Sequence, residues 1–383
     1  MTLLVALGMP GIMSFWGNFA LGVIASEVFD DHCMFHVETL EDIQNAWKNR
    51  TSENVIVTSH YPDAGLSAFL LKTNAPYVVF RENAVDSVSY LARQLAREDI
   101  GLIRSVSASI ACISQVRAHP FLINLDREKL GAVPIHRIIA QICRQLRISL
   151  TSSAMVRCLK QLGMDNVDSA TQVDQIPTLE KSAQINPFYA APGANPTNVS
   201  ENLLEIARSV VQPFDGKLIK DQVSSLTWPQ ESFLLADKGG EPSEGEIELV
   251  GRARCLVYGP YFHLPSGEWN AKFSLGIEHN VYGQIFTIEV HSDGLLSKIR
   301  VRPSGTGSFA AEAAFRIDSP KTPIEIRLFT DSGSIEGSIA YWFAELSPID
   351  LSAPDSEHAA TDVALEHDQD AIATSEETVN YPE

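Results

Sequence analysis

The spacing of apolar residues changes once along this chain, and the change limits the folds that the chain can adopt. From residue 2 to about 165, short apolar runs such as 2–8 and 54–58 alternate with stretches of helical spacing. From about 245 to 346, apolar and polar residues instead alternate with a period of two, which is typical of strands. The sequence therefore predicts an α/β domain followed by an all-β domain, each with its own core.

Strands and helices follow one another in the first part of the chain. We expect strands at 2–8, 34–37, 54–58, 77–80 and 122–125. We expect helices at 14–28, 40–49, 65–73, 84–98, 100–117, 134–147 and 151–162. This order of elements predicts a three-layer arrangement, with a parallel sheet covered by helices on both faces.

The later part of the chain contains seven segments with strand periodicity. They are residues 252–258, 268–277, 283–291, 298–302, 308–317, 324–330 and 337–345. Gly and Pro turn residues separate these segments at short intervals. This pattern predicts an antiparallel β-sandwich of about 100 residues, jelly-roll-like in its topology.

These patterns give four expected regions. We expect an α/β domain at 1–165, a Pro-rich connector at 166–240, a β-sandwich at 241–348 and an acidic tail at 349–383. The connector is expected to contain one helix, at 199–211, with Asn198 as its N-cap.

The charge of the chain is strongly acidic and unevenly distributed. Lys and Arg number 29 and Asp and Glu number 48, which gives a formal net charge of −19. This excess of acid argues against nucleic-acid binding, because phosphate backbones attract basic surfaces. Residues 346–383 contain ten of the acidic residues, no Lys or Arg and few large apolar side chains. We therefore expect the tail to be solvated and disordered.

The cysteines and the N-terminus bear on the cellular compartment. The five cysteines are far apart and lack CxxC spacing, so they predict neither a disulfide framework nor a metal site. The apolar run at 1–7 is too short to span a membrane, and no Lys or Arg precedes Lys48. We therefore expect a cytoplasmic protein without a membrane span or a signal peptide.

The first candidate for chemistry is the turn at 8–16, which joins the first strand to the first helix. Backbone N–H groups and the helix dipole converge at such a turn and favour an anion. The turn lacks the G-x4-G-K-[ST] pattern and contains no Lys. By itself this turn favours an ordinary strand-to-helix connection over an anion site.

Two further segments follow the third and fourth expected strands. Residues 59–62 are Ser-His-Tyr-Pro, and Arg81 is followed eight positions later by Ser89 and then by Tyr90. Together with the first turn, these segments resemble the PAPS-dependent sulfotransferase family over roughly residues 2–165. That family has a phosphosulfate loop after its first strand, an [ST]-H-x-P segment and an R-x7-S-Y segment. The resemblance implies a P-loop-type nucleotide fold.

The resemblance also implies a role for each matching residue. PAPS would be the cofactor, with Arg81 and Ser89 at its 3′-phosphate. His60 would be the catalytic base that accepts a proton from the acceptor hydroxyl. The 5′-phosphosulfate would lie in the loop that contains Pro10, Gly11, Ser14 and Phe15. As alternatives, Arg81, Ser89 and His60 are compatible with a surface arginine, a mid-helix serine and a loop histidine without function.

The chain also departs from the family pattern. Residues 11–13 are Gly-Ile-Met where the family has a cation followed by small residues, and Thr58 stands where the family has a lysine. The cation that would stabilise the transferred sulfuryl group is therefore missing from the loop. Either another base replaces it or activity is weak or lost; the candidates near in sequence are Lys72, Arg93 and Arg97.

The second domain suggests a partner. Residues 258–267, which begin Tyr-Gly-Pro-Tyr, resemble a segment of the β-sandwich modules that are appended to bacterial glycan-modifying transferases. Tyr258, Tyr261 and Trp269 are candidates for stacking on sugar rings, although packing in the core explains their strand spacing equally well. The position of such a module after a transferase-like domain favours a saccharide or glycolipid acceptor.

Four hypotheses for the function remain open. The first is sulfuryl transfer from PAPS to a hydroxyl of a saccharide or glycolipid. The second is a degenerate nucleotide-fold protein that binds carbohydrate without catalysis, which the missing loop lysine favours. The third is an accessory or protein-interaction module linked to a glycosyltransferase. A P-loop kinase is disfavoured, because the loop has no Lys and no Walker-B acid is evident.

Overall fold

The computed structural model divides the chain into two compact units. It describes residues 2–73, 75–116, 122–164, 167–168, 175–185, 199–215, 223, 225–279, 283–349 and 370–371. The first unit, here called the α/β unit, contains residues 1–207, 214–221 and 319–321. The second, here called the β unit, contains residues 208–213, 222–318 and 322–383.

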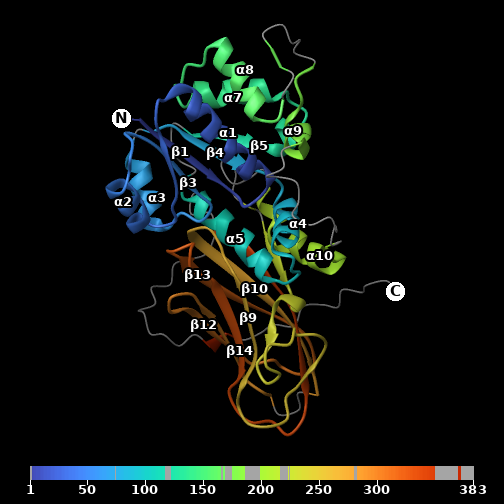
Figure 1. The fold of residues 1–383 in the computed structure, drawn as a ribbon. Helices are drawn as coiled ribbons and strands as arrows, with labels where there is room; N and C mark the ends of the chain where they lie inside the picture. Colours follow the sequence, from blue (N-terminus) through green and yellow to red (C-terminus); the bar gives the residue numbers. More distant parts are fainter. Residues whose placement is uncertain are drawn as a thin grey trace, which may run out of the picture. The chain divides into compact units, whose positions relative to one another are not determined.

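The α/β unit is built on one parallel sheet of five strands in the order β2-β3-β1-β4-β5 (Figure 1). The strands are β1 (Thr2–Gly8), β2 (Cys33–His36), β3 (Asn54–Ser59), β4 (Tyr77–Arg81) and β5 (Leu122–Asp126). All five lie close to their predicted positions. Because Leu7 pairs with Ser59 and Gly8 with Phe80, the carboxyl ends of β1, β3 and β4 meet at one edge of the sheet.

Helices cover both faces of this sheet, as predicted (Figure 1). The helices among the described residues are α1 (Ile12–Val28), α2 (Leu40–Lys48), α3 (Ala64–Lys72), α4 (Ala84–Leu95), α5 (Gly101–Ser114), α6 (Arg127–Leu130), α7 (Ile135–Gln145), α8 (Ser152–Gln161), α9 (Leu179–Ile185) and α10 (Glu201–Val210), the last of which is divided between the two units. On one face, Trp16 of α1, Ile139 of α7 and Leu159 of α8 join Phe80 of β4 in a buried cluster. On the other face, α5 packs against β1.

Helix α4 is shorter than predicted, and helix α10 lies in the expected connector. Helix α4 ends at Leu95 instead of 98, because Ala96 adopts a left-handed conformation with φ of 49°. Helix α10 matches the helix expected in the connector, but its expected N-cap Asn198 lies outside the described residues.

The β unit consists of two antiparallel sheets that face each other. One has the order β13-β10-β15-β6, with β8 also paired to β15, and the other has the order β16-β12-β11-β14-β9-β7, in which β16 alone runs parallel to its neighbour. The strands are β6 (Leu226–Pro229), β7 (Leu234–Leu235), β8 (Ile247–Glu248), β9 (Cys255–Phe262), β10 (Gly267–Glu278), β11 (Phe286–His291), β12 (Leu295–Val301), β13 (Gly307–Ile317), β14 (Ile324–Thr330), β15 (Ser338–Pro348) and β16 (Asp370–Ala371). The seven longest, β9 to β15, are the seven predicted segments.

The core of the β unit begins earlier in the sequence than residue 241. Trp228 of β6 is fully buried, and its ring lies 5.7 Å, edge to face, from the ring of Phe262 in the opposite sheet. Phe233, also fully buried, lies 4.5 Å from the ring of Tyr341. The segment expected to be a connector therefore supplies large side chains to this core. Apart from residues 349 and 370–371, the expected tail lies outside the described residues.

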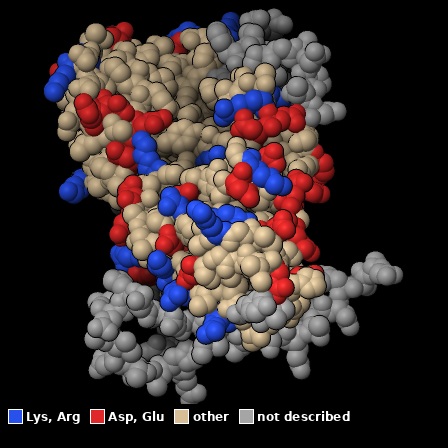
Figure 2. Space-filling model, turned by 90° about the horizontal axis from the view of Figure 1, so that it is seen from below, with Lys and Arg blue, Asp and Glu red and all other residues tan. Residues whose placement is uncertain are grey.

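Charged side chains of both signs lie on the surface, and the cysteines are unpaired. Acidic and basic side chains are interspersed over the described part of the face shown in Figure 2. All five cysteines are free thiols, and Cys112, Cys143 and Cys158 are buried. Among the described residues, none of the helices combines the length and apolar character needed to cross a membrane. The same residues contain no cluster of three or more His, Cys, Asp or Glu side chains suited to a metal ion.

Candidate functional site

The three segments singled out in the α/β unit meet at the carboxyl edge of its sheet. The turn after β1, His60 after β3 and Arg81 at the end of β4 all lie there. Nδ1 of His60 is 2.6 Å from the carbonyl oxygen of Gly8, so the first two segments are in direct contact. This edge, where the strand order reverses about β1, is where open parallel sheets bind ligands.

His60 is held in one tautomer. A carbonyl oxygen can only accept a hydrogen bond, so Nδ1 of His60 carries the proton and donates it to Gly8. The pKa of His60 is lowered to about 4, chiefly by burial. The hydrogen bond to Gly8 acts in the opposite direction and raises this pKa. The imidazole is therefore neutral at pH 7, with a lone pair on Nε2. This is the form that a general base requires.

Aromatic rings surround His60. The ring of Phe15, which is 42% exposed, lies 6.0 Å from that of His60 and 5.4 Å from that of Tyr90. The ring of His36 lies 5.1 Å from His60, and its Nδ1 is 3.1 Å from Oγ1 of Thr58. The structure thus brings together the predicted His60 and Phe15. His36 was not among the residues predicted from the sequence; it belongs to no motif, and its place at the end of β2 was the only available signal.

The N-terminus of α1 holds a carboxylate from the chain itself. The backbone N–H of Met13 donates a 2.8 Å hydrogen bond to Oε2 of Glu82, a side chain only 3% exposed. A Cβ on Gly11 would lie 2.3 Å from Cδ of Glu82. The carboxylate of Glu82 therefore lies where the resemblance placed the phosphosulfate. Glu82 was not among the residues predicted from the sequence.

The other loop residues form a tight, buried turn. Pro10, Gly11 and Ser14 are buried. The Ser14 hydroxyl donates to the carbonyl oxygen of Met9, and a Cβ on Gly8 would collide with its Oγ. The proton of Ser14 is thus used inside the turn. Its hydroxyl supports the loop conformation in this structure.

Arg81 is buried beside two carboxylates. It is 3% exposed and is in register with Asp126 on the neighbouring strand β5. Burial lowers its pKa, whereas Asp126 and Asp215 raise it. Nε of Arg81 has no hydrogen-bond partner among the described residues. Ser89 donates its hydroxyl proton to the carbonyl oxygen of Val85, at 3.0 Å.

A basic side chain, Arg127, does lie near the N-terminus of α1, but it was not among the bases predicted to replace the missing loop cation. Nη1 of Arg127, the first residue of α6, lies 3.9 Å from Oε1 of Glu82. The same guanidinium makes a paired contact with Glu180, with Nε–Oε1 at 2.8 Å and Nη2–Oε2 at 3.0 Å. Arg127 follows β5, so its position at the carboxyl edge was the available signal. Of the bases expected to substitute, Arg97 pairs with Asp99 at 3.4 Å.

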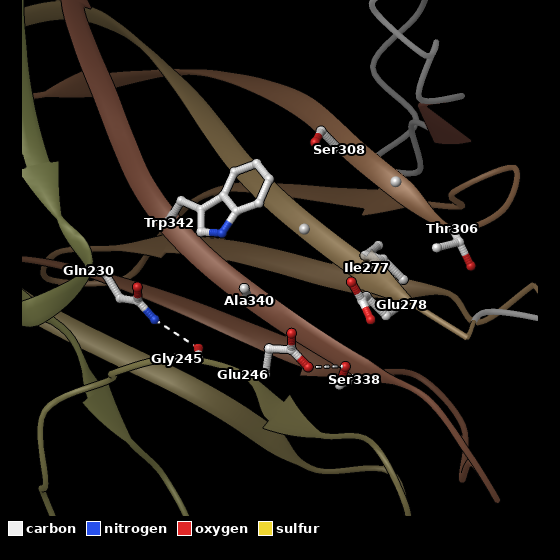
Figure 3. Close-up of a pocket in the computed structure, with 12 residues that line it drawn as sticks. Gln230, Gly245, Glu246, Ile277, Glu278, Thr306, Ser308, Ser338, Ala340 and Trp342 are labelled. Carbon is white, nitrogen blue, oxygen red and sulfur yellow. Dashed lines mark hydrogen bonds between the residues drawn. The ribbon is translucent and has the colours of Figure 1, made fainter. Parts of the chain in front are cut away.

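The β unit contains a second candidate site, a groove of about 290 Å³ on the sheet that contains β10, β13 and β15 (Figure 3). Trp342 of β15 is 40% exposed and lines this groove. Ser274 pairs with Phe343 and Leu275 with Tyr341, so Trp342 is the extra residue of a β-bulge. The indole covers Gly276 of β10, where a Cβ would lie 2.5 Å from Cζ2 of Trp342.

Polar side chains surround this indole (Figure 3). The hydroxyl of Ser338 donates a 2.7 Å hydrogen bond to Oε2 of Glu246. Glu278, Thr306 and Ser308 line the same groove, and no Lys or Arg is among the described residues that form it. A flat apolar surface flanked by hydroxyl and carboxylate groups suits a ligand with an apolar face and many hydroxyls.

The aromatic residues predicted to stack on sugars lie elsewhere. Trp269 is 3% exposed and donates from Nε1 to the carbonyl oxygen of Pro265 at 3.0 Å, so it packs in the core. Tyr261 donates to Oε1 of Glu325 at 2.7 Å, and its ring is 6.3 Å from that of Tyr258. The missed signal was the run Tyr-Trp-Phe at 341–343, which breaks the strand alternation.

Comparison with known proteins gives weak similarities. No family model and no curated protein matches the chain. A mouse sulfotransferase complexed with PAP is 9% identical, with a TM-score of 0.33 over 45% of this chain and 66% of that chain. The module TmCBM61, in complex with β-1,4-galactotriose, is 14% identical, with a TM-score of 0.22 over 33% of this chain and 88% of that one. The CBM36-1 domain of a xylanase from the hindgut metagenome of Trinervitermes trinervoides is 9% identical, with a TM-score of 0.22 over 33% of this chain and 100% of that domain.

Proposed function

We propose that the β unit binds a saccharide and that the groove around Trp342 is its binding site. The observation that carries this proposal is the indole of Trp342, which is 40% exposed, lies over Gly276 and is bordered by groups able to bind hydroxyls. Removing exposed aromatic surface from water is favourable, and the C–H face of a sugar ring offers a flat apolar surface to cover it.

The negative charge of the groove favours uncharged saccharides over anionic ones. Glu246 and Glu278 line it, and no basic side chain does so among its described residues. A sulfated sugar or a uronate would meet these carboxylates without a compensating cation, and like-charge contacts disfavour a ligand. The groove is therefore suited to a neutral saccharide.

Affinity electrophoresis tests this proposal with the full chain. The protein is run through gels that contain a neutral β-1,4-galactan, a neutral mixed-linkage glucan or polygalacturonate. We expect retardation by at least one neutral polymer and none by polygalacturonate. Retardation by the anionic polymer alone would overturn the assignment of the groove.

Gly276→Ala tests the support beneath the indole. The new Cβ would lie 2.5 Å from Cζ2 of Trp342, so the ring must move to relieve the clash. We expect saccharide affinity, measured by calorimetry, to fall by about 3- to 10-fold, since the displacement costs of the order of 1 kcal/mol. Gly294→Ala is the matched control, because its Cβ meets no atom within 4 Å, and it should leave the affinity unchanged.

Sulfuryl transfer from PAPS to a saccharide or glycolipid hydroxyl is the second candidate function, assigned to the α/β unit. The orientation of His60 favours it: the neutral ring can accept a hydroxyl proton at Nε2 while Nδ1 remains bonded to Gly8. The residues fit PAPS only in part. Arg81 has a buried, unpartnered Nε suited to a 3′-phosphate, whereas Glu82 fills the loop meant for the phosphosulfate.

Arg81→Ala tests the nucleotide part of this second candidate. Loss of the planar guanidinium should weaken binding of adenosine 3′,5′-bisphosphate by about 2 kcal/mol, or roughly 30-fold. Binding of AMP, which lacks the 3′-phosphate, should change by less than about 3-fold by the same reasoning. Arg144→Ala, an exposed arginine on α7, is the control. Equal losses for both nucleotides in calorimetry would remove Arg81 from 3′-phosphate recognition.

A further inference from the structure

The N-terminus of α1 is occupied by the carboxylate of Glu82, which is poorly accommodated there. Oε2 of Glu82 accepts the N–H of Met13, but Oε1 is buried and has no hydrogen-bond partner among the described residues. The nearest cation to Oε1 is Nη1 of Arg127, which at 3.9 Å is too far for a hydrogen bond. A buried carboxylate oxygen without a partner carries an uncompensated desolvation cost.

The groups that face Glu82 come from three helices. Arg127 lies on α6, Glu180 on α9, and Asp86 and Tyr90 on α4. The pKa of Glu82 is raised to about 7, chiefly by burial and to a smaller extent by Asp86 and Glu180. The Met13 N–H and Arg127 act in the opposite direction. Because Arg127 is also paired with Glu180, its charge is shared between two carboxylates.

We propose that Glu82 is a plug in an oxyanion site formed by the N-terminus of α1, and that it controls the binding of sulfate or phosphate groups there. The site consists of the backbone N–H of Met13, the turn at Gly11 and the guanidinium of Arg127. A charged Glu82 excludes an oxyanion by repulsion and by filling the space. A neutral or displaced Glu82 opens the site to a tetrahedral oxyanion, whether free or part of a larger molecule.

This proposal depends neither on saccharide binding nor on sulfuryl transfer. It predicts a direction with pH, because the carboxylate becomes neutral as pH falls through about 7. The repulsion between Glu82 and an oxyanion then disappears, so sulfate affinity should rise from pH 8 to pH 6.

The test is a calorimetric titration of the full chain with sodium sulfate, with ionic strength held constant by NaCl. At pH 8 we expect Glu82→Gln to bind sulfate at least about 10-fold more tightly than the wild type, since an adjacent like charge has been removed. The glutamine has nearly the same volume, which favours correct folding, and its neutral amide accepts more weakly from the Met13 N–H than a carboxylate does, so sulfate can displace it. The affinity of the wild type should rise several-fold from pH 8 to pH 6, whereas that of Glu82→Gln should stay constant.

Two controls decide whether a gain in sulfate affinity comes from removing the Glu82 carboxylate. Glu41→Gln removes an equal charge from an exposed position on α2 and should leave sulfate affinity within about twofold. The amide resonance of Met13 should shift on sulfate addition to Glu82→Gln. Equal affinities of wild type and Glu82→Gln at pH 8, an equal gain in Glu41→Gln, or binding that leaves the Met13 resonance unchanged would each overturn the proposal.

A parallel titration with PAP distinguishes the sources of the oxyanion. If Glu82→Gln gains affinity for sulfate and PAP alike, the opened site accepts nucleotides. If it gains affinity for sulfate alone, the result supports Glu82 as a plug that excludes a free oxyanion. The same result contradicts nucleotide binding at this site.

Discussion

Trp228→Ala is expected to lower the free energy of unfolding of the β unit by about 3–5 kcal/mol, the usual cost of truncating a buried tryptophan. Trp228 is 0% exposed and packs edge to face on Phe262 across the two sheets. Truncation would leave a cavity between the sheets that neighbouring side chains refill only in part. Hydrogen exchange of the β10 amides in the full chain, measured with and without the substitution, reports this change.

The same experiment decides where the β unit begins. Trp342→Ala is the matched control, because this tryptophan is 40% exposed on the same sheet and should cost less than about 1 kcal/mol. If the core began at residue 241, Trp228 would lie in a connector, and the two substitutions would have similar small effects. Such a result would contradict the assignment of β6 to the β unit.

Trp342→Ala is expected instead to lower saccharide affinity by at least about 30-fold, or 2 kcal/mol, the scale of a central aromatic contact. The indole supplies the flat apolar surface of the groove, and alanine leaves only Gly276 and polar groups there. Calorimetric titration with the neutral polymer that retards the wild type most strongly gives the measurement.

Leu295→Ala controls for the loss of exposed apolar surface in this unit. Leu295 is 54% exposed on β12 of the other sheet, so its truncation should leave saccharide affinity unchanged. Affinity of Trp342→Ala within twofold of the wild type would mean that the ligand contacts another surface.

Much of the fold was predictable because its elements carry local signals. The buried strands 2–8, 54–58 and 77–80 are largely apolar runs separated by segments of helical spacing, so the parallel sheet follows from the sequence. The β unit shows the period of two in β9 to β15. Strand β6 was missed because its four residues, Leu-Thr-Trp-Pro, are too few to show a period.

The candidate sites were harder to predict, because they depend on side-chain directions set by tertiary packing. That Arg81 and His60 lie at one edge follows from their places after parallel strands. No local pattern indicates that Glu82 reaches the N-terminus of α1, which lies 69 residues earlier at Met13. Likewise, the exposure of Trp342 depends on a bulge that forms only against β10.

The central claim, that Trp342 is the saccharide contact, is tested most directly by tryptophan emission. The full chain is titrated with a panel of neutral gluco-, xylo-, galacto- and manno-oligosaccharides. Trp16, Trp228 and Trp269 are buried, and Trp47 lies on α2 in the α/β unit, so a ligand in the groove should perturb Trp342. We predict a saturable change in the wild type that is absent in Trp342→Phe. A saturable change of equal size in Trp342→Phe, or no change with any member of the panel, would contradict the claim.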